Sequence, residues 1–142
     1  MERILRTVLI VTAALAAACA PRERTLVLLS TNDMHAKIRN FPRLAAAVEA
    51  CRDTAQLVVL VDAGDRWTGN AYVDRAATPG MPMIALMNRL GYDVATLGNH
   101  EFDHGQAFLG RMIDSMDFEV VCANVVLSLI HISEPTRPRL IS

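Results

Sequence analysis

The sequence predicts an α/β domain built on a parallel sheet, and three observations carry this prediction. Strand-like apolar runs alternate with helical patterns three times between Thr25 and Asn124, which favours parallel pairing through right-handed crossovers. Aromatic residues make up only 5% of the chain, whereas alanine, valine, leucine and methionine are abundant, as suits a sheet covered by aliphatic helices. Each strand-like run also ends in a polar cluster. A chain of 142 residues has room for one modest domain.

The first half of this domain is predicted to run strand, helix, strand. The segment "TLVLLSTND" (25–33) is continuously apolar before it turns polar, which is typical of a buried strand entering a loop. The segment "FPRLAAAVEACRD" (41–53) is predicted to be helical, because Pro42 suits a first helical turn and apolar residues recur along one face. The segment "LVVLVDAGD" (57–65) repeats the pattern of the first strand.

The second half continues the alternation. The segment "MPMIALMNRLG" (81–91) is predicted to be a helix that starts near Pro82 and stops at Gly91, a residue that accepts the left-handed conformation of a helix end. The remaining segments are, in order, a short strand with its loop, a helix and a fourth strand: 93–103, 106–116 and 118–124.

The amino-terminal segment is expected to be a secretion signal rather than part of the fold. Arginines near the start precede an apolar run that is shorter than the roughly 20 residues a membrane-spanning helix needs. Residues 1–18 are therefore predicted to be a signal peptide, and 19–24 a short tether. Because "LAAAC" resembles the bacterial lipobox, Cys19 is predicted to carry lipid and to anchor the protein at the membrane, facing the periplasm or the cell surface. Soluble export after cleavage at Ala20 and a retained anchor are the alternatives.

The segment "LSLIHISEPTRPRLIS" (127–142) is predicted to be non-native. It lacks the period of a helix or strand, and "LSLIHISEPTR" is the in-frame translation of a common transposon-based sequencing adaptor, which resumes as "IS" after an index. The native protein is then expected to continue past Val126 into other sequence, so 25–126 would be a partial domain. His131 is accordingly excluded as a ligand.

Charge and cysteine content bear on two further features, a nucleic-acid partner and a disulfide. The formal net charge of −1 and the absence of a lysine or arginine run give no support for a nucleic-acid partner. Cys51 and Cys122 fall in a predicted helix and a predicted strand, where buried apolar cysteines are favoured over a disulfide.

The polar clusters "TNDMH", "DAGD", "GNHEFD" and "AN" are expected to meet, because the carboxyl ends of parallel strands share one edge of the sheet. Asp33 and His35 are two residues apart, so in an extended segment they would project to the same side. Asp103 would reach the imidazole of His100 if that segment turns helically. Taken singly, each of these residues could be a turn, cap or surface residue.

As a set, the side chains predict a metal centre. Asp33, His35, Asp65 and Asn99 offer oxygen and nitrogen donors without thiolate, which suits Mn²⁺, Zn²⁺, Fe or Co²⁺. A carboxylate such as that of Asp65 can bridge two ions roughly 3.5–4 Å apart, the separation used in phosphatases and nucleases.

The motifs "TNDMHA", "DAGD" and "LGNHEFD" resemble the ordered motifs D-x-H, G-D and G-N-H-[ED] of the calcineurin-like metallophosphoesterases, and the versions here most resemble bacterial exported 5′-nucleotidases and their 2′,3′-cyclic phosphodiesterase relatives. The resemblance covers about 25–126 and implies the amino-terminal half of an αββα sandwich. It implies two divalent ions. The implied roles are a first metal site at Asp33 and His35, a bridge at Asp65, a second site at Asn99, and catalysis by His100 with Asp103 orienting it.

The resemblance also implies a function and its alternatives. The expected activity is hydrolysis of a nucleotide to a nucleoside and phosphate by water activated between the two ions. A phosphodiesterase acting on cyclic nucleotides or other phosphoesters, and a non-catalytic surface lipoprotein, are the alternatives. Glu101 and His104 are expected to be non-catalytic, as a structural salt link or exposed side chains, and Asn124 to shape the pocket. The family's later ligands, a His and a G-H-x-H pair, do not occur before residue 127, so the chain alone is expected to be inactive.

Overall fold

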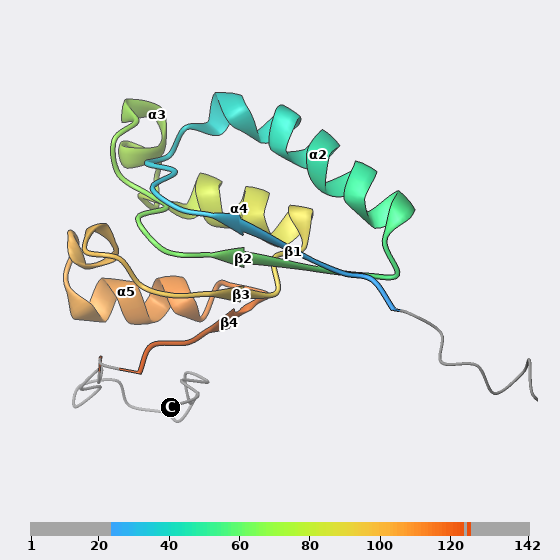
Figure 1. Cartoon of the computed structure of the whole chain (residues 1–142). Coiled ribbons are helices and arrows are strands. Elements are labelled where there is room, and N and C mark those ends of the chain that lie inside the picture. The colour runs from blue at the N-terminus through green and yellow to red at the C-terminus, as the bar shows by residue number, and fades with distance from the viewer. Residues whose placement is uncertain (1–23, 124, 126–142) are drawn as a thin grey trace, which may run out of the picture.

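The computed structural model describes residues 24–123 and 125, and these form one parallel sheet with helices packed on it (Figure 1). The strands are β1 (Leu26–Thr31), β2 (Leu57–Asp62), β3 (Val94–Ala95) and β4 (Glu119–Val120). They pair in the order β1-β2-β3-β4, and every pair is parallel. The α/β architecture that the alternating pattern predicts is therefore confirmed. The predicted signal peptide, Cys19, Asn124 and the segment 127–142 lie outside the described residues.

The helices follow the predicted segments closely. They are α2 (Phe41–Thr54), α3 (Ala71–Asp74), α4 (Met81–Leu90) and α5 (Gln106–Ile113), with short 3-10 helices η1 (Ile38–Asn40) and η2 (His100–Phe102). Proline occupies the first turn of both α2 and α4, and Gly91 ends α4 with φ of 73°. The expected end signals therefore operate as predicted. The single-turn helices α3, η1 and η2 were not expected from the periodicity, because one turn is too short to show a period.

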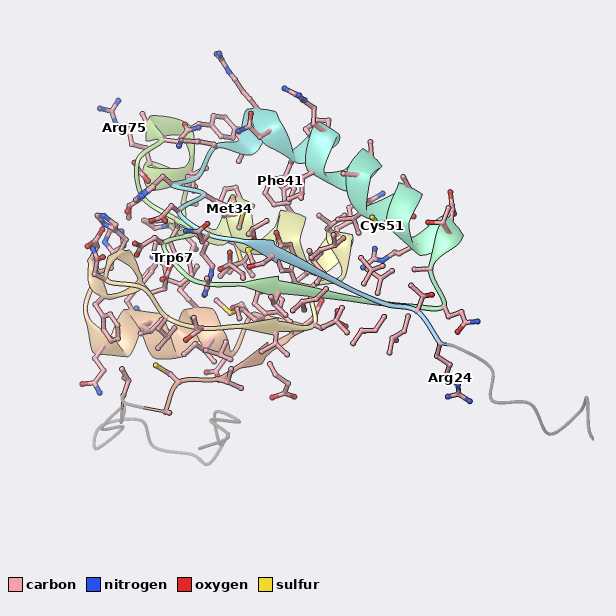
Figure 2. All side chains as sticks on the ribbon, in the orientation of Figure 1. Arg24, Met34, Phe41, Cys51, Trp67 and Arg75 are labelled. Carbon is pink, nitrogen blue, oxygen red and sulfur yellow. The ribbon has the colours of Figure 1, made fainter. Side chains whose placement is uncertain are left out.

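The helices α2, α4 and α5 lie on the same side of the sheet (Figure 1). A sheet whose strands follow in sequential order, joined by right-handed crossovers, requires this one-sided arrangement. One core cluster joins Phe41 and Val48 of α2 to Leu60 of β2, and Figure 2 shows Phe41 pointing from α2 toward the strands. A second cluster surrounds Trp67 and Leu109.

The other face of the sheet is open. Leu26 and Leu28 of β1 are 59% and 64% exposed, and Leu57, the register partner of Leu26, is 57% exposed. An αββα sandwich would place a second sheet here, but the described residues supply only one sheet. Within the described part of the chain, no helix is long and apolar enough to cross a membrane.

Candidate functional site

Three loops leave the carboxyl ends of β1, β2 and β3 and meet at one edge of the sheet. The first two run side by side, because the Asp33 N–H donates to the Gly64 carbonyl at 3.1 Å and the His35 N–H donates to the Asp65 carbonyl at 3.0 Å. These bonds extend the parallel pairing of β1 and β2 past the ends of the strands. The polar clusters are thus brought together by the backbone itself.

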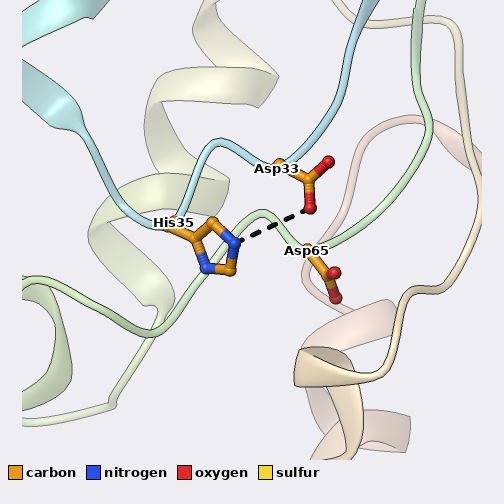
Figure 3. Close-up of side chains that lie close together, drawn as sticks. All are labelled: Asp33, His35 and Asp65. Carbon is orange, nitrogen blue, oxygen red and sulfur yellow. Dashed lines mark ion pairs between the residues drawn. The ribbon is translucent and has the colours of Figure 1, made fainter.

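Asp33, His35 and Asp65 lie close together at this edge of the sheet (Figure 3). One ligand atom from each lies within 4.8 Å of the others, and His35 Nε2 is 3.7 Å from Asp33 Oδ1. Asp33 is exposed, whereas His35 and Asp65 are half-buried. Two carboxylates and an imidazole at this spacing can hold one divalent cation of the manganese, iron, cobalt or zinc type, so the residues present fit such an ion.

The convergence arises from a conformation that the sequence pattern did not reveal. Asp33, His35 and Asp65 have φ values of 49°, 44° and 53°, so all three adopt the left-handed region instead of the extended one. This region costs an L residue about 1–2 kcal/mol, less for Asp and His, and it persists where the surroundings fix the backbone. The bonds between the two loops supply that fixation. The side chains of Asp33 and His35 therefore meet through a turn, not through the alternation of a strand.

His100 lies against this cluster. Its ring is 5.0 Å from the His35 ring between centroids, in an edge-to-face arrangement. Its N–H donates to Asp65 Oδ1 at 2.9 Å, and its Nδ1 is 2.8 Å from Asp103 Oδ2. The 3-10 turn of η2 is what places Asp103 three residues on beside the imidazole. The predicted contact between His100 and Asp103 is present.

Trp67 fixes the other side of the His100 backbone. This side chain is only 1% exposed, and its indole Nε1–H donates to the His100 carbonyl at 3.0 Å. Figure 2 places Trp67 at the carboxyl edge of the sheet. Asn99 precedes His100 at the start of η2, where it is exposed and its side chain makes no capping hydrogen bond. Its amide oxygen is thus not committed to the cap of η2.

Two glycines allow the second and third loops to touch. A Cβ on Gly64 would overlap the backbone nitrogen of Gly98 and lie 2.9 Å from its Cα. A Cβ on Gly98 would overlap the carboxylate of Asp65 and lie 2.7 Å from the Asp65 nitrogen. The glycine before Asp65 and the glycine before Asn99 are therefore required by close backbone approach.

A buried ionic group below the site was missed by sequence reasoning. Asp62, Arg66 and Glu101 are 2%, 0% and 0% exposed, and Arg66 Nε donates to Asp62 Oδ2 at 2.9 Å. Burial raises the pKa of the Asp62 carboxyl above its ordinary value, and the Arg66 guanidinium opposes that rise. Arg66 also donates to the Thr96 carbonyl in the third loop. The i,i+4 spacing of Asp62 and Arg66 was the one available signal, but such spacing is common on exposed helices too.

His104 and the two cysteines lie outside the cluster of Asp33, His35 and Asp65. His104 is exposed and its ring packs on Phe108, with centroids 4.9 Å apart. Cys51 and Cys122 are half-buried and are not joined to each other by a disulfide. Glu101, by contrast, is buried beside the site and forms the expected structural salt link, with Arg66 Nε 4.0 Å from its Oε1.

The contact between His100 and Asp103 changes the acidity of both groups. The hydrogen bond to Asp103 raises the pKa of His100, since a carboxylate partner stabilises the imidazolium, and the same bond lowers the pKa of Asp103. The folded chain therefore holds a proton on His100 at a pH where a free imidazole would have lost more of it.

An Asp103→Asn variant should lower the pKa of His100, because an amide cannot stabilise the imidazolium by its charge. The measurement is an NMR titration of the His100 ring in the metal-free chain. Asp114→Asn is the matched control, since Asp114 is an exposed carboxylate at the end of α5 and should leave the His100 titration in place. An unchanged His100 pKa in Asp103→Asn would contradict the assigned cause.

Comparisons with known proteins match this chain to one family of enzymes. A family model described as calcineurin-like phosphoesterase matches residues 26–133. The chain is 34% identical over 123 residues to the trifunctional nucleotide phosphoesterase protein YfkN of Bacillus subtilis, covering 70% of this chain and 8% of that protein. It is 38% identical over 92 residues to a 2′,3′-cyclic-nucleotide 2′-phosphodiesterase/3′-nucleotidase of Haemophilus influenzae, covering 61% of this chain and 14% of that protein.

Comparison with solved structures also matches this chain to a nucleotidase. The structure of a 5′-nucleotidase precursor from Thermus thermophilus superimposes with a TM-score of 0.64 at 31% identity, covering 70% of this chain and 22% of that one. The chain thus spans less than a quarter of the length of each of these three relatives.

Proposed function

Because this chain belongs to the calcineurin-like phosphoesterase family, we propose that it is the amino-terminal part of a metal-dependent, exported 5′-nucleotidase. The observation that carries the proposal is the convergence of Asp33, His35 and Asp65 within 4.8 Å, with His100 packed against them. The proposed substrate is a nucleotide, which would be converted to a nucleoside and phosphate.

The side chains divide the chemistry between binding and proton transfer. In this proposal Asp33 and His35 would hold one divalent ion, Asn99 would hold a second, and Asp65 would contribute to both sites. When bound, two such ions would neutralise phosphate charge and activate water as a nucleophile. The carboxylate of Asp65 is oriented for this role by the His100 N–H at 2.9 Å. A hydrogen bond that fixes the orientation of a metal ligand strengthens metal binding.

His100 is proposed to donate a proton to the oxygen that leaves the phosphate. Its Nδ1 is engaged by Asp103 Oδ2 at 2.8 Å, which leaves Nε2 as the atom that faces substrate. Asp103 holds the ring in that orientation and favours its protonated form. An imidazole whose pKa is raised by a carboxylate partner is a suitable general acid for an alkoxide leaving group.

Hydrolysis of a cyclic nucleotide is the second candidate, because the Haemophilus influenzae relative is named as both a cyclic phosphodiesterase and a nucleotidase. Both reactions use the same bridged site and differ in the leaving oxygen.

Export with a lipid anchor at Cys19 is part of the proposal as well. Metabolic labelling with palmitate, compared between wild type and Cys19→Ser, tests it. Soluble export is the alternative outcome of that labelling. A non-catalytic surface lipoprotein would show labelling without hydrolysis.

The test of function is phosphate release by the protein encoded when the source DNA is read past the codon for Val126. We expect hydrolysis of AMP that EDTA abolishes and added Mn²⁺ restores, and little release from the 142-residue chain alone. Faster turnover of 2′,3′-cyclic AMP than of AMP would select the phosphodiesterase. Metal-independent hydrolysis, or none of either substrate with any of the four metals, would contradict the proposal.

A further inference from the structure

Glu101 occupies an unusual position between the second and third loops. It belongs to η2, which lies at the site, yet its side chain is fully buried, with 0% exposure. Its Oε2 accepts from the Asp65 N–H at 2.8 Å and from the Gly98 N–H at 2.6 Å. Its Oε1 accepts from the Arg66 N–H at 3.0 Å. One carboxylate therefore joins the backbones of both loops.

Three backbone donors are what make this burial stable. An isolated buried carboxylate is costly, whereas one that accepts several N–H groups forms charge-assisted bonds that are about twice as strong as neutral ones. The Arg66 guanidinium lies 4.0 Å away and adds a compensating charge. Each of the three donors belongs to a loop residue outside the strands and helices. Beyond the ends of β2 and β3, the Glu101 carboxylate therefore supplies the acceptors that a neighbouring strand would supply within a sheet.

The same turn holds Asp65 at two points. Glu101 accepts from the main-chain N–H of Asp65, and the neighbouring residue His100 donates its own N–H to Asp65 Oδ1 at 2.9 Å. Asp65 has φ of 53°, a left-handed conformation that the hydrogen bonds around it help to hold. Two consecutive residues of η2 thus fix the direction of the Asp65 carboxylate: Glu101 holds the Asp65 main-chain N–H, and His100 holds the Asp65 side chain.

We propose that Glu101 is a positioning residue that fixes the Asp65 carboxylate for metal binding. The inference rests on the proposed function, because it takes Asp65 as a metal ligand. Glu101 does not touch substrate or metal in this role. It acts through the backbone of Asp65 and through Gly98, whose nitrogen it holds against the second loop.

The experiment compares Mn²⁺ binding by the wild-type chain, Glu101→Gln and Val48→Ala. A glutamine has the same shape as Glu101 but only one acceptor oxygen. The backbone N–H groups that bond to one of the two carboxylate oxygens of Glu101 therefore lose their acceptor. Val48→Ala is the matched control for stability, because Val48 is 0% exposed in the core on α2 and lies outside the site cluster. Mn²⁺ affinity is measured by the electron paramagnetic resonance signal of the free ion, and the unfolding temperature by circular dichroism.

We expect Glu101→Gln to weaken Mn²⁺ binding by about 10- to 100-fold, the effect typical of removing a group that orients a ligand. Val48→Ala should lower the unfolding temperature and change the dissociation constant less than about twofold while folded. Equal Mn²⁺ affinity of Glu101→Gln and wild type would overturn the inference and leave the proposed metal site intact. An equal loss of affinity in Val48→Ala would overturn it too, because stability alone would then explain the effect.

Amide hydrogen exchange in the wild-type chain provides a test that does not depend on any variant folding. The N–H groups of Asp65, Arg66 and Gly98 should exchange slowly and resonate downfield, as expected for donors to a buried carboxylate. Free exchange of the Asp65 and Gly98 amides would overturn the inference. Failure of the wild-type chain to bind Mn²⁺ at all would instead overturn the proposed metal site, and with it the positioning of Asp65 toward a metal.

Discussion

Replacing Gly64 by alanine is expected to destabilise the fold by about 3 kcal/mol or more. Gly64 has φ of 102°, which L residues rarely adopt, and this alone costs about 1–2 kcal/mol. The added Cβ would also overlap the nitrogen of Gly98 and lie 3.0 Å from the carbonyl carbon of Leu97. These are backbone atoms, so no rotamer change can relieve the overlap, and overpacking of this kind costs about 1–3 kcal/mol.

Guanidinium unfolding followed by tryptophan fluorescence measures this effect, since the chain has a single tryptophan and Trp67 is buried beside the site. Gly105→Ala is the matched control. Gly105 also has a positive φ, of 81°, with ψ of 167°, but apart from its chain neighbours no atom of the described residues lies within 4 Å of the place that its Cβ would take, so only the backbone strain of about 1–3 kcal/mol is expected. Equal destabilisation by the two variants would show that the close approach of the loops does not contribute.

Replacing Asp65 by asparagine is expected to weaken Mn²⁺ binding by about 100-fold or more, because it removes the charge of a proposed direct ligand rather than of a residue that orients one. The fold should survive. Asparagine tolerates φ of 53° as well as aspartate does, and its side-chain oxygen can still accept from the His100 N–H. Loss of binding without loss of the unfolding transition is therefore the expected combination.

Isothermal titration with Mn²⁺ measures this loss, with Asp53→Asn as the control. Asp53 is an exposed carboxylate near the end of α2, at the opposite edge of the sheet, so its neutralisation changes the net charge by the same amount without touching the site. If Asp53→Asn weakened binding as much as Asp65→Asn, general electrostatic attraction would explain the affinity. If neither variant weakened it, the ion would bind elsewhere on the chain.

The open face of the sheet lowers the stability against which these variants are compared. Three leucines there are more than half exposed, and burying such side chains contributes about 1.5–3 kcal/mol each. The stability of the chain is then lower than the stability of a protein in which that face is covered. Differences between paired variants, such as Gly64→Ala against Gly105→Ala, remain meaningful because the uncovered face is common to both.

The sequence by itself determined the order of strands and helices, because apolar periodicity and end signals such as Pro42 and Gly91 are local properties of the chain. It also determined that Asp33, His35 and Asp65 gather at one edge, since the carboxyl ends of parallel strands must share an edge. Periodicity was weaker at the last two strands. Each pairs over only two residues, because β3 turns into its loop directly after Ala95.

Only the tertiary structure decided how those residues meet. The left-handed backbone of Asp33 and His35 depends on hydrogen bonds to the loop after β2, about 30 residues away in the chain, and no pattern within "TNDMHA" records them. Glu101 was expected to be a structural salt link or an exposed side chain. It does form a salt link with Arg66, but the sequence did not reveal that it also accepts from three backbone donors in two loops. Burial and partnering are set by what packs around a side chain, so a carboxylate that ties the site together has the same sequence signature as one that faces water.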